Sequence, residues 1–171
     1  MSAPNRKAYE ALVERAHRLA RPAEQTQTTE DRTEIVTFMA AGGRYAVDTR
    51  FVHAILPFEK PGAIPGAPSV FTGLINFRGE ILPVIDLPRF LDLKTSGAES
   101  AWMVALGDRS AEIAIAVGSG VEIDFIRDSD VITPPDRGDE TCVRGVTRDA
   151  LTILDGAALL ASRRLFIDRA P

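Results

Sequence analysis

Few side chains in this 171-residue chain are suited to catalysis, and those few are scattered along it. His17 and His53 are the only two histidines, and Cys142 is the only cysteine. A nucleophilic triad needs a histidine that an acid positions beside the nucleophile. His53 instead lies inside an apolar run, FVHAIL, and no histidine stands near Cys142 in the sequence. The pattern therefore favours a structural strand histidine and gives no indication of a catalytic thiol.

Two other segments match ligand-binding motifs only in part. Residues 128–140 contain five acids, but not in the glycine and glutamate pattern of a calcium loop, so a solvated surface is the better interpretation. Gly118-Ser119-Gly120 lacks the lysine and the following helix of a phosphate loop, which favours a tight turn or bulge between strands. No histidine or cysteine cluster has zinc-ligand spacing. We therefore expect no catalytic residue, no cofactor and no metal.

Charge and hydropathy restrict the partners. The 24 acids and 20 bases give a net charge of -4, which does not suggest binding to nucleic acid or to anionic lipid. No apolar run approaches 18 residues, so we expect no direct membrane insertion. The first ten residues, MSAPNRKAYE, lack the apolar region of a secretory signal, and a single cysteine cannot form an internal disulfide. These features predict a cytoplasmic protein.

Residues 1–33 differ from the rest. Apolar residues at helical spacing predict an amphipathic helix over Arg6–Arg21, and Pro22 ends it. Its narrow stripe consists of Tyr9, Leu12, Val13, Ala16, Leu19 and Ala20. The polar segment Glu24–Thr33 then predicts a linker. Packing on the domain, binding to a partner and a partly free helix all remain open.

From Glu34 onward the hydrophobic period is two, which is typical of strands. Eight to ten short strands are expected, over residues 35–41, 44–49, 51–56, 73–77, 80–85, 101–107, 112–117, 121–126, 143–147 and 151–154. Asp86 and Asp155 each stand at the N-cap position of a short helix. This pattern predicts a mainly β fold of small barrels or a sandwich and argues against βαβ units.

The stretch GLINFRGEILPVIDL, Gly73–Leu87, predicts a hairpin with Arg78 at its tip. A similar order of strand, arginine-containing turn, strand, aspartate and helix recurs over Gly145–Leu160. Two similar lobes divided near residues 94–100 would explain the recurrence, although hairpin-then-cap is also a common local solution. An exposed arginine is either a solvated turn residue or an interface residue with bidentate bonding capacity, and these physical arguments do not decide between the two.

The same stretch resembles the signature of the CheW domain family, G-V-x-N-L-R-G-x-I-V-P-V-I-D-L. Upstream, RYAVD at residues 44–48 resembles the family's E-Y-G-I-D, with Val52 and Ile55 following at the right distance. The loop IPGAP at residues 64–68 resembles its I-P-x-x-P. Downstream, residues 114–117 and 143–146 stand where the family has a G-I-V-V strand and a G-x-G segment. The resemblance spans about residues 34–161 and leaves a C-terminal segment, 162–171.

The resemblance implies two intertwined, SH3-like five-stranded barrels and a non-catalytic adaptor. Such adaptors couple the cytoplasmic tips of methyl-accepting chemoreceptors to the histidine kinase CheA in cytoplasmic signalling arrays. Carried over by position, the residues expected to bind partners are Val52, Ile55, Asn76, Phe77, Arg78, Gly79 and Ile123. Of these, Val52, Asn76 and Ile123 match positions near the receptor-binding groove between the lobes, and Arg78 matches the arginine important for array assembly and kinase control.

The sequence departs from the family at three places. Ala54 replaces a frequent glutamate that can pair with the signature arginine, so Arg78 must pair elsewhere or stay available to a partner. Phe77 replaces the usual leucine, and Gly118-Ser119-Gly120 replaces a V-D-x-V continuation. An enzyme or small-ligand binder remains the competing hypothesis; it requires a cleft that gathers His53 and carboxylates, whereas an apolar groove lined by Val52 and Ile123 favours the adaptor.

Overall fold

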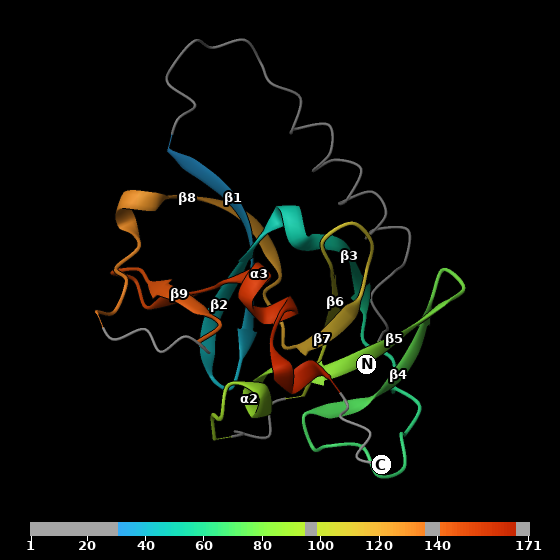
Figure 1. Ribbon diagram of the computed structural model, residues 1–171. Coiled ribbons are helices and arrows are strands. Elements are labelled where there is room, and N and C mark those ends of the chain that lie inside the picture. Colours follow the sequence, from blue (N-terminus) through green and yellow to red (C-terminus); the bar gives the residue numbers. More distant parts are fainter. Residues whose placement is uncertain (1–30, 95–98, 136–140, 167–171) are drawn as a thin grey trace.

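The computed structural model describes residues 31–94, 99–135 and 141–166 (Figure 1). Ten strands, two short α-helices and three single-turn 3-10 helices follow one another in this part of the chain. They are β1 (Arg32–Ala40), β2 (Gly43–Asp48), η1 (Thr49–Phe51), β3 (Val52–Pro57), β4 (Phe71–Phe77), β5 (Glu80–Asp86), α2 (Leu87–Phe90), β6 (Trp102–Leu106), β7 (Ile113–Val117), β8 (Glu122–Arg127), η2 (Asp128–Asp130), β9 (Val143–Val146), β10 (Leu151–Leu154), α3 (Gly156–Leu160) and η3 (Arg163–Leu165). The mainly β prediction is confirmed, while the helix expected over Arg6–Arg21 lies outside the described residues.

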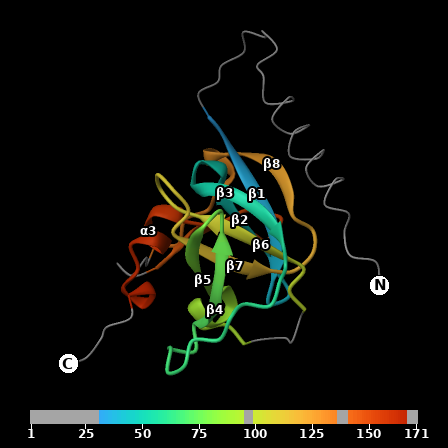
Figure 2. The same cartoon turned by 90° about the vertical axis from the view of Figure 1, so that its right-hand side faces the viewer.

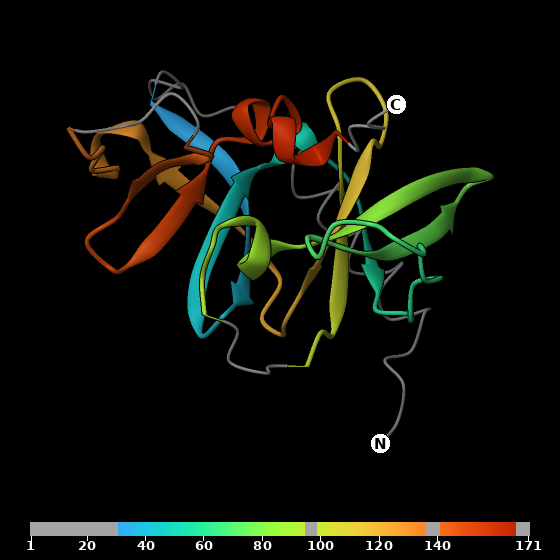
Figure 3. The same ribbon diagram turned by 60° about the horizontal axis from the view of Figure 1, so that its bottom comes forward.

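The strands form two five-stranded sheets. The first sheet has the order β8-β1-β2-β10-β9, and the second sheet has the order β3-β6-β7-β5-β4. Isolated bridges, Ile132 to Val146 and Gly62 to Leu74, join the segment after β8 to β9 and the segment after β3 to β4. These bridges bring the outer strands of each sheet together, as barrels require. Figure 3 shows the sheets side by side, with α3 over the boundary between them.

The two sheets do not divide the chain near residues 94–100, as the internal recurrence suggested. The chain enters the second sheet at Val52 and leaves it at Val117, so strands on both sides of residues 94–100 share that sheet. The reason is long-range parallel pairing: β5 pairs with β7, and β2 pairs with β10. The second lobe is therefore inserted in the first: β3–β7 are continuous in the sequence, and hairpin β1–β2 completes the sheet of β8–β10 across that insertion.

The internal recurrence is real in three dimensions. Asp86 Oδ1 accepts a hydrogen bond from the Arg89 N–H at 3.0 Å and caps α2, and Asp155 Oδ1 accepts one from the Ala158 N–H at 3.0 Å and caps α3. A Cβ on Gly73 would lie 2.4 Å from the Gly62 carbonyl oxygen, and one on Gly145 would lie 2.6 Å from the Ile132 carbonyl oxygen. Each lobe thus needs a glycine where a crossing segment meets its second hairpin.

Side-chain alternation along the strands creates three cores. The two cores inside the barrels are small: one is built around Ile35, Ala46 and Ile153, and the other around Ala105 and Ala114. The largest core takes the opposite faces of both sheets and lies between them. Its members include Val36, Phe38, Tyr45, Val47, Phe71, Ile85, Leu87, Val104, Leu106, Ile113, Ile115, Val117, Leu154 and Leu159. The packing between lobes is therefore as apolar as a domain interior.

Two smaller features can also be compared with the sequence-based expectations, and only the second agrees with them. Phe51, expected to start a strand, instead ends the 3-10 turn η1, because the side chain of Asp48 accepts the Arg50 N–H at 2.9 Å and caps that turn. Gly118 does lie in a turn between strands, where its N–H bonds to the Met39 carbonyl at 2.7 Å. Among the described residues, no helix is long and apolar enough to cross a membrane.

Candidate partner-binding surface

The hairpin tip between β4 and β5 is fixed by local chemistry. Arg78 and Gly79 are its two turn residues, with φ angles of 53° and 87°. Two positive φ values in a two-residue hairpin turn define type I′, which matches the twist of the flanking strands and favours glycine. Asn76 Oδ1 accepts a hydrogen bond from the Gly79 N–H at 3.0 Å. The tip is therefore a defined structure that holds Arg78 in a left-handed conformation.

The side chain of Arg78 lies over its own neighbour. Its guanidinium carbon is 4.9 Å from the centroid of the Phe77 ring, a cation–π contact. Phe77 itself packs against the core of the second barrel, as Ala54 does. Within the part of the chain that the structure describes, Arg78 forms no ion pair. Ala54 offers no carboxylate to the guanidinium, and the exposed Arg78 side chain lies against the ring of Phe77 instead.

A second exposed feature is the outer face of β8. Among the described strands, β8 pairs only with β1. Ile123 is 44% exposed and Phe125 is 60% exposed, and their spacing places both on one face. Ile123 stands opposite Val36 in the ladder, and Val36 belongs to the core between the sheets. The outer face of β8 therefore continues the inter-sheet apolar surface out to solvent.

Val52 and Ile55 lie on β3, the outermost strand of the second sheet. Both are half-buried and pack against the same inter-sheet core that Val36 joins. A bulge between Val52 and Ala54 shifts the pairing of β3 with β6 at this point. Residues of β3 and β8 thus border one apolar core from different sheets, which is the arrangement that an apolar groove between lobes requires.

The seven residues expected from the sequence fall into two groups. Asn76, Phe77, Arg78 and Gly79 form one connected unit at the hairpin tip. Val52 and Ile55 pack against the inter-sheet core, and Ile123 stands opposite Val36, a member of that core, in the ladder of β8 with β1. Phe125 is not among the residues expected from the sequence, although the period of two within the expected strand at 121–126 places it on the same face as Ile123.

His53 has a structural partner. Its Nε2–H donates to the carbonyl oxygen of Gly107 at 3.2 Å, which ties β3 to the turn after β6. Among the described residues, no group of three histidine, cysteine, aspartate or glutamate side chains could hold a metal ion. The polar convergence around His53 that the enzyme hypothesis requires is not found in the described part of the chain.

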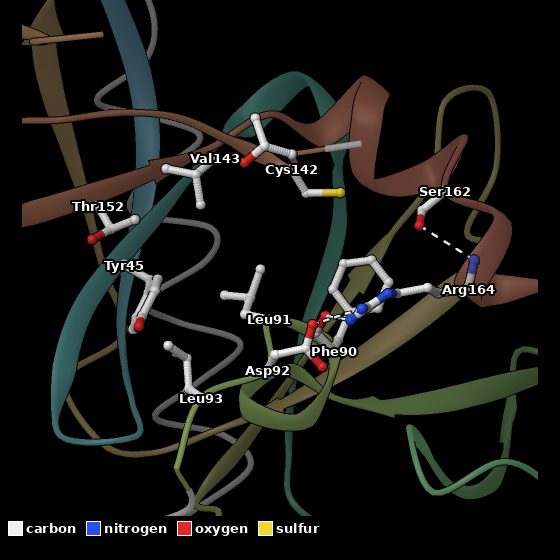
Figure 4. A pocket seen from close by; sticks show the side chains of 11 residues that line it. Tyr45, Phe90, Leu91, Asp92, Leu93, Cys142, Val143, Thr152, Ser162 and Arg164 are labelled. Carbon is white, nitrogen blue, oxygen red and sulfur yellow. Dashed lines mark hydrogen bonds and ion pairs between the residues drawn. The ribbon is translucent and has the colours of Figure 1, made fainter. Parts of the chain in front are cut away.

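The structure contains a pocket of about 360 Å³ elsewhere, at the boundary between the sheets (Figure 4). Its lining residues are Tyr45, Phe90, Leu91, Asp92, Leu93, Thr141, Cys142, Val143, Thr152, Ser162 and Arg164. Arg164 donates to Asp92 Oδ2 at 2.6 Å and to the Phe90 carbonyl at 2.7 Å. This pair joins the end of α2 to the segment after α3. The charges of Asp92 and Arg164 thus compensate each other, and these contacts, called the Asp92–Arg164 clamp below, connect the two lobes.

The pKa values of three titratable groups that line the pocket are shifted by their surroundings. The hydrogen bond from Arg164 holds the pKa of Asp92 below its usual value. Burial, and secondarily the charge of Asp155, raises the pKa of the Cys142 thiol. Burial also raises the pKa of Tyr45. A buried thiol kept in its protonated form is a poor nucleophile.

Comparison with known proteins agrees with this geometry. Residues 34–164 match the family model described as "CheW-like domain". The chain belongs to the CheW-like domain family. The matched range includes both sheets and the hairpin that carries Arg78.

Individual relatives extend the comparison. The chain is 32% identical over 118 residues to the chemotaxis protein CheW of Bacillus subtilis (strain 168), covering 68% of this chain and 70% of the relative. It is 27% identical over 148 residues to the chemotaxis protein CheW of Treponema pallidum (strain Nichols), covering 80% and 86%. Its fold is similar to the crystal structure of the scaffolding protein TtCheW from Thermoanaerobacter tengcongensis, with a TM-score of 0.63, 26% identity, and coverage of 71% of this chain and 88% of that one. This chain is thus a CheW-family chemotaxis adaptor.

Proposed function

We propose that this chain is a non-catalytic adaptor that couples the cytoplasmic tips of methyl-accepting chemoreceptors to the histidine kinase CheA within a cytoplasmic array. The observation that carries the proposal is the hairpin tip. A defined type I′ turn presents Arg78 to solvent, and a neighbouring ring orients its guanidinium. A guanidinium so oriented can bind a carboxylate of a partner in a bidentate manner, with less loss of side-chain freedom than a lysine.

The two groups of surface residues suit two kinds of contact. Val52, Ile55 and Ile123 would take the apolar face of a receptor helix, because amphipathic helices bind apolar grooves through side chains at helical spacing. The tip residues Asn76–Gly79 would take a polar contact with the kinase. Contacts of this regulatory kind are often small in area, and an array would strengthen them through multivalency.

Isothermal calorimetry of the full chain tests the proposal. The ligands are a receptor-tip fragment and CheA, both encoded by the organism from which this chain derives. Arg78→Ala should weaken binding to CheA about thirtyfold, the equivalent of about 2 kcal/mol for an interface arginine. Arg148→Ala is the matched control, because Arg148 is an exposed arginine in the corresponding turn of the first sheet, and it should leave affinity unchanged.

The outcomes are distinct. Binding to neither ligand would sink the proposal. Equal losses for Arg78→Ala and Arg148→Ala would mean that the arginines act only through net charge. Binding of CheA that Arg78→Ala leaves unchanged would remove the hairpin tip from the interface.

A further inference from the structure

Two arginines without an acidic partner stand at the end of the apolar face of β8. Strands β1 and β8 lie side by side (Figure 2), and Arg32 at the start of β1 is directly opposite Arg127 at the end of β8. Both side chains are exposed, and neither forms an ion pair within the described part of the chain. Like charges directly opposite each other destabilise a sheet, so this arginine pair costs stability in the unbound protein.

The arginine pair shares its face with the apolar residues of β8. Side chains alternate between the two faces of a strand, so Ile123, Phe125 and Arg127 point to one side of β8. Glu122 and Asp124 point to the other side. The face that borders the inter-sheet core therefore changes from apolar to basic along β8.

The acids nearest to the arginine pair are already engaged. Glu34, on the same face of β1, is half-buried, and its carboxylate accepts a hydrogen bond from the Thr49 hydroxyl at 3.3 Å. Asp128, in the turn after β8, pairs with Arg144 at 2.9 Å. Among the described residues, no carboxylate lies within ion-pair distance of either arginine of the pair. The two guanidinium groups can therefore receive an anion from a partner.

We propose that Arg32 and Arg127 bind a carboxylate of the partner helix that docks on Ile123 and Phe125. A guanidinium binds a carboxylate through two parallel hydrogen bonds, and the negative charge would relieve the repulsion within the arginine pair. This inference rests on the proposed function, because the partner helix is the receptor helix assigned to the groove. It adds a chemical requirement, namely an acid beyond one end of the apolar stripe of that helix.

The spacing along β8 specifies where the acid must stand. Residues two apart on a strand are separated by about 6.7 Å, and residues four apart on a helix by about 6 Å. A helix that lies along β8 therefore places residues i, i+4 and i+8, counted in either chain direction, over Ile123, Phe125 and Arg127. The first two must be apolar and the third must be Glu or Asp.

Model peptides test this subsite without the receptor. Each is an alanine-based helix of about 20 residues with leucine at i and i+4 and with Glu, Gln or Lys at i+8. The Glu peptide should shift the amide signals of residues 122–127 in the isotope-labelled full chain. It should also bind about tenfold more tightly than the Gln peptide, because its carboxylate meets two exposed arginines.

Substitutions in the chain assign that preference to the arginine pair. Arg32→Gln with Arg127→Gln should abolish it. Arg44→Gln is the matched control and should preserve it, because Arg44 is an exposed arginine of the same sheet whose side chain points to the opposite face. Arg32→Glu with Arg127→Glu should reverse the preference, so that the Lys peptide binds most tightly. The thermal midpoint of Arg127→Gln should not fall below that of the parent chain.

Several results would overturn the inference. They are equal affinities of the three peptides, an absence of shifts on β8, and equal effects of Arg127→Gln and Arg44→Gln. A clear fall of the midpoint in Arg127→Gln would also overturn it, because the arginine would then serve the fold.

The receptor-tip fragment separates this inference from the proposed function. Arg32→Gln with Arg127→Gln should weaken binding of the fragment about tenfold, an effect that added salt should reduce, whereas Arg44→Gln should leave it unchanged. If the double variant binds the fragment as tightly as the parent chain does, the inference fails and the receptor function stands. If the parent chain does not bind the fragment, the receptor function fails, and the peptides still decide whether the arginine pair binds a carboxylate.

Discussion

Truncation of Ile115 offers a direct test of the shared core between the sheets. Ile115 lies at the centre of β7, is fully buried and belongs to the inter-sheet core. Ile115→Ala removes three carbons, which corresponds to about 2.4 kcal/mol at about 0.8 kcal/mol per buried methylene. The residual cavity adds to this, so we expect a loss of about 3 kcal/mol in the free energy of unfolding.

Urea unfolding with two probes measures that loss. With an m-value of about 2 kcal/mol/M, the midpoint should fall by about 1.5 M. Trp102, the only tryptophan, reports from the second sheet through its fluorescence, and far-UV circular dichroism reports from both sheets. Ile81→Ala is the control, because its exposed side chain should change stability by no more than about 0.5 kcal/mol.

A variant in the first sheet tests whether the shared core couples the unfolding of the two lobes. Val36→Ala truncates the same core from the first sheet, where Val36 is almost fully buried. If the core couples the lobes, this variant must lower the Trp102 midpoint as much as the dichroism midpoint. A dichroism transition that moves while the Trp102 transition stays in place would refute the coupling and show that the lobes unfold separately.

Three further predictions concern local features. Asp86→Ala and Asp155→Ala should each cost about 0.5–2 kcal/mol in thermal unfolding, because each removes an N-cap; no change would show that the caps are idle. Gly73→Ala should cost more than about 1 kcal/mol, whereas Gly62→Ala, whose Cβ would have ordinary contacts, should cost less; equal costs would contradict the close approach at Gly73. Because the pKa of Cys142 is raised on folding, its contribution to stability is complete below the unfolded value of about 8.5 and is lost as the pH rises through the folded value. Stability of the parent chain should thus fall above about pH 8.5 more steeply than that of Cys142→Ala, and parallel profiles would contradict it.

Much of the fold could be predicted from local sequence. The alternation of apolar residues predicts the strands, and the aspartates before short apolar runs predict the caps of α2 and α3. Asn76 and Gly79 are typical of the turn that the structure contains. Each of these features depends on residues that are close together in the chain, so a short stretch of sequence is enough to predict it.

The insertion of the second lobe in the first depends on a pairing between distant strands that no short sequence window contains. The parallel ladder of β2 with β10 joins residues about a hundred positions apart, and nothing in either strand alone specifies it. The Asp92–Arg164 clamp spans 72 positions and was missed for the same reason. Of the candidate surface, Arg78 was identified through the family signature and Ile123 by its position in the family resemblance, whereas the strand period alone indicates Phe125.

The insertion of the second lobe between β2 and β8 also has a consequence for synthesis on the ribosome. Residues 52–117 supply every strand of the second sheet in one continuous stretch, so that sheet can close as soon as β7 emerges. Hairpin β1–β2 ends at Asp48, but its partner β8 begins only at Glu122. At about 5–20 residues per second, the nascent hairpin waits about 4–15 seconds for that strand. The second sheet is finished at Val117, whereas the first sheet is finished only when β10 ends at Leu154, so the second sheet can cover the apolar residues of β1 and β2 before the first lobe is complete.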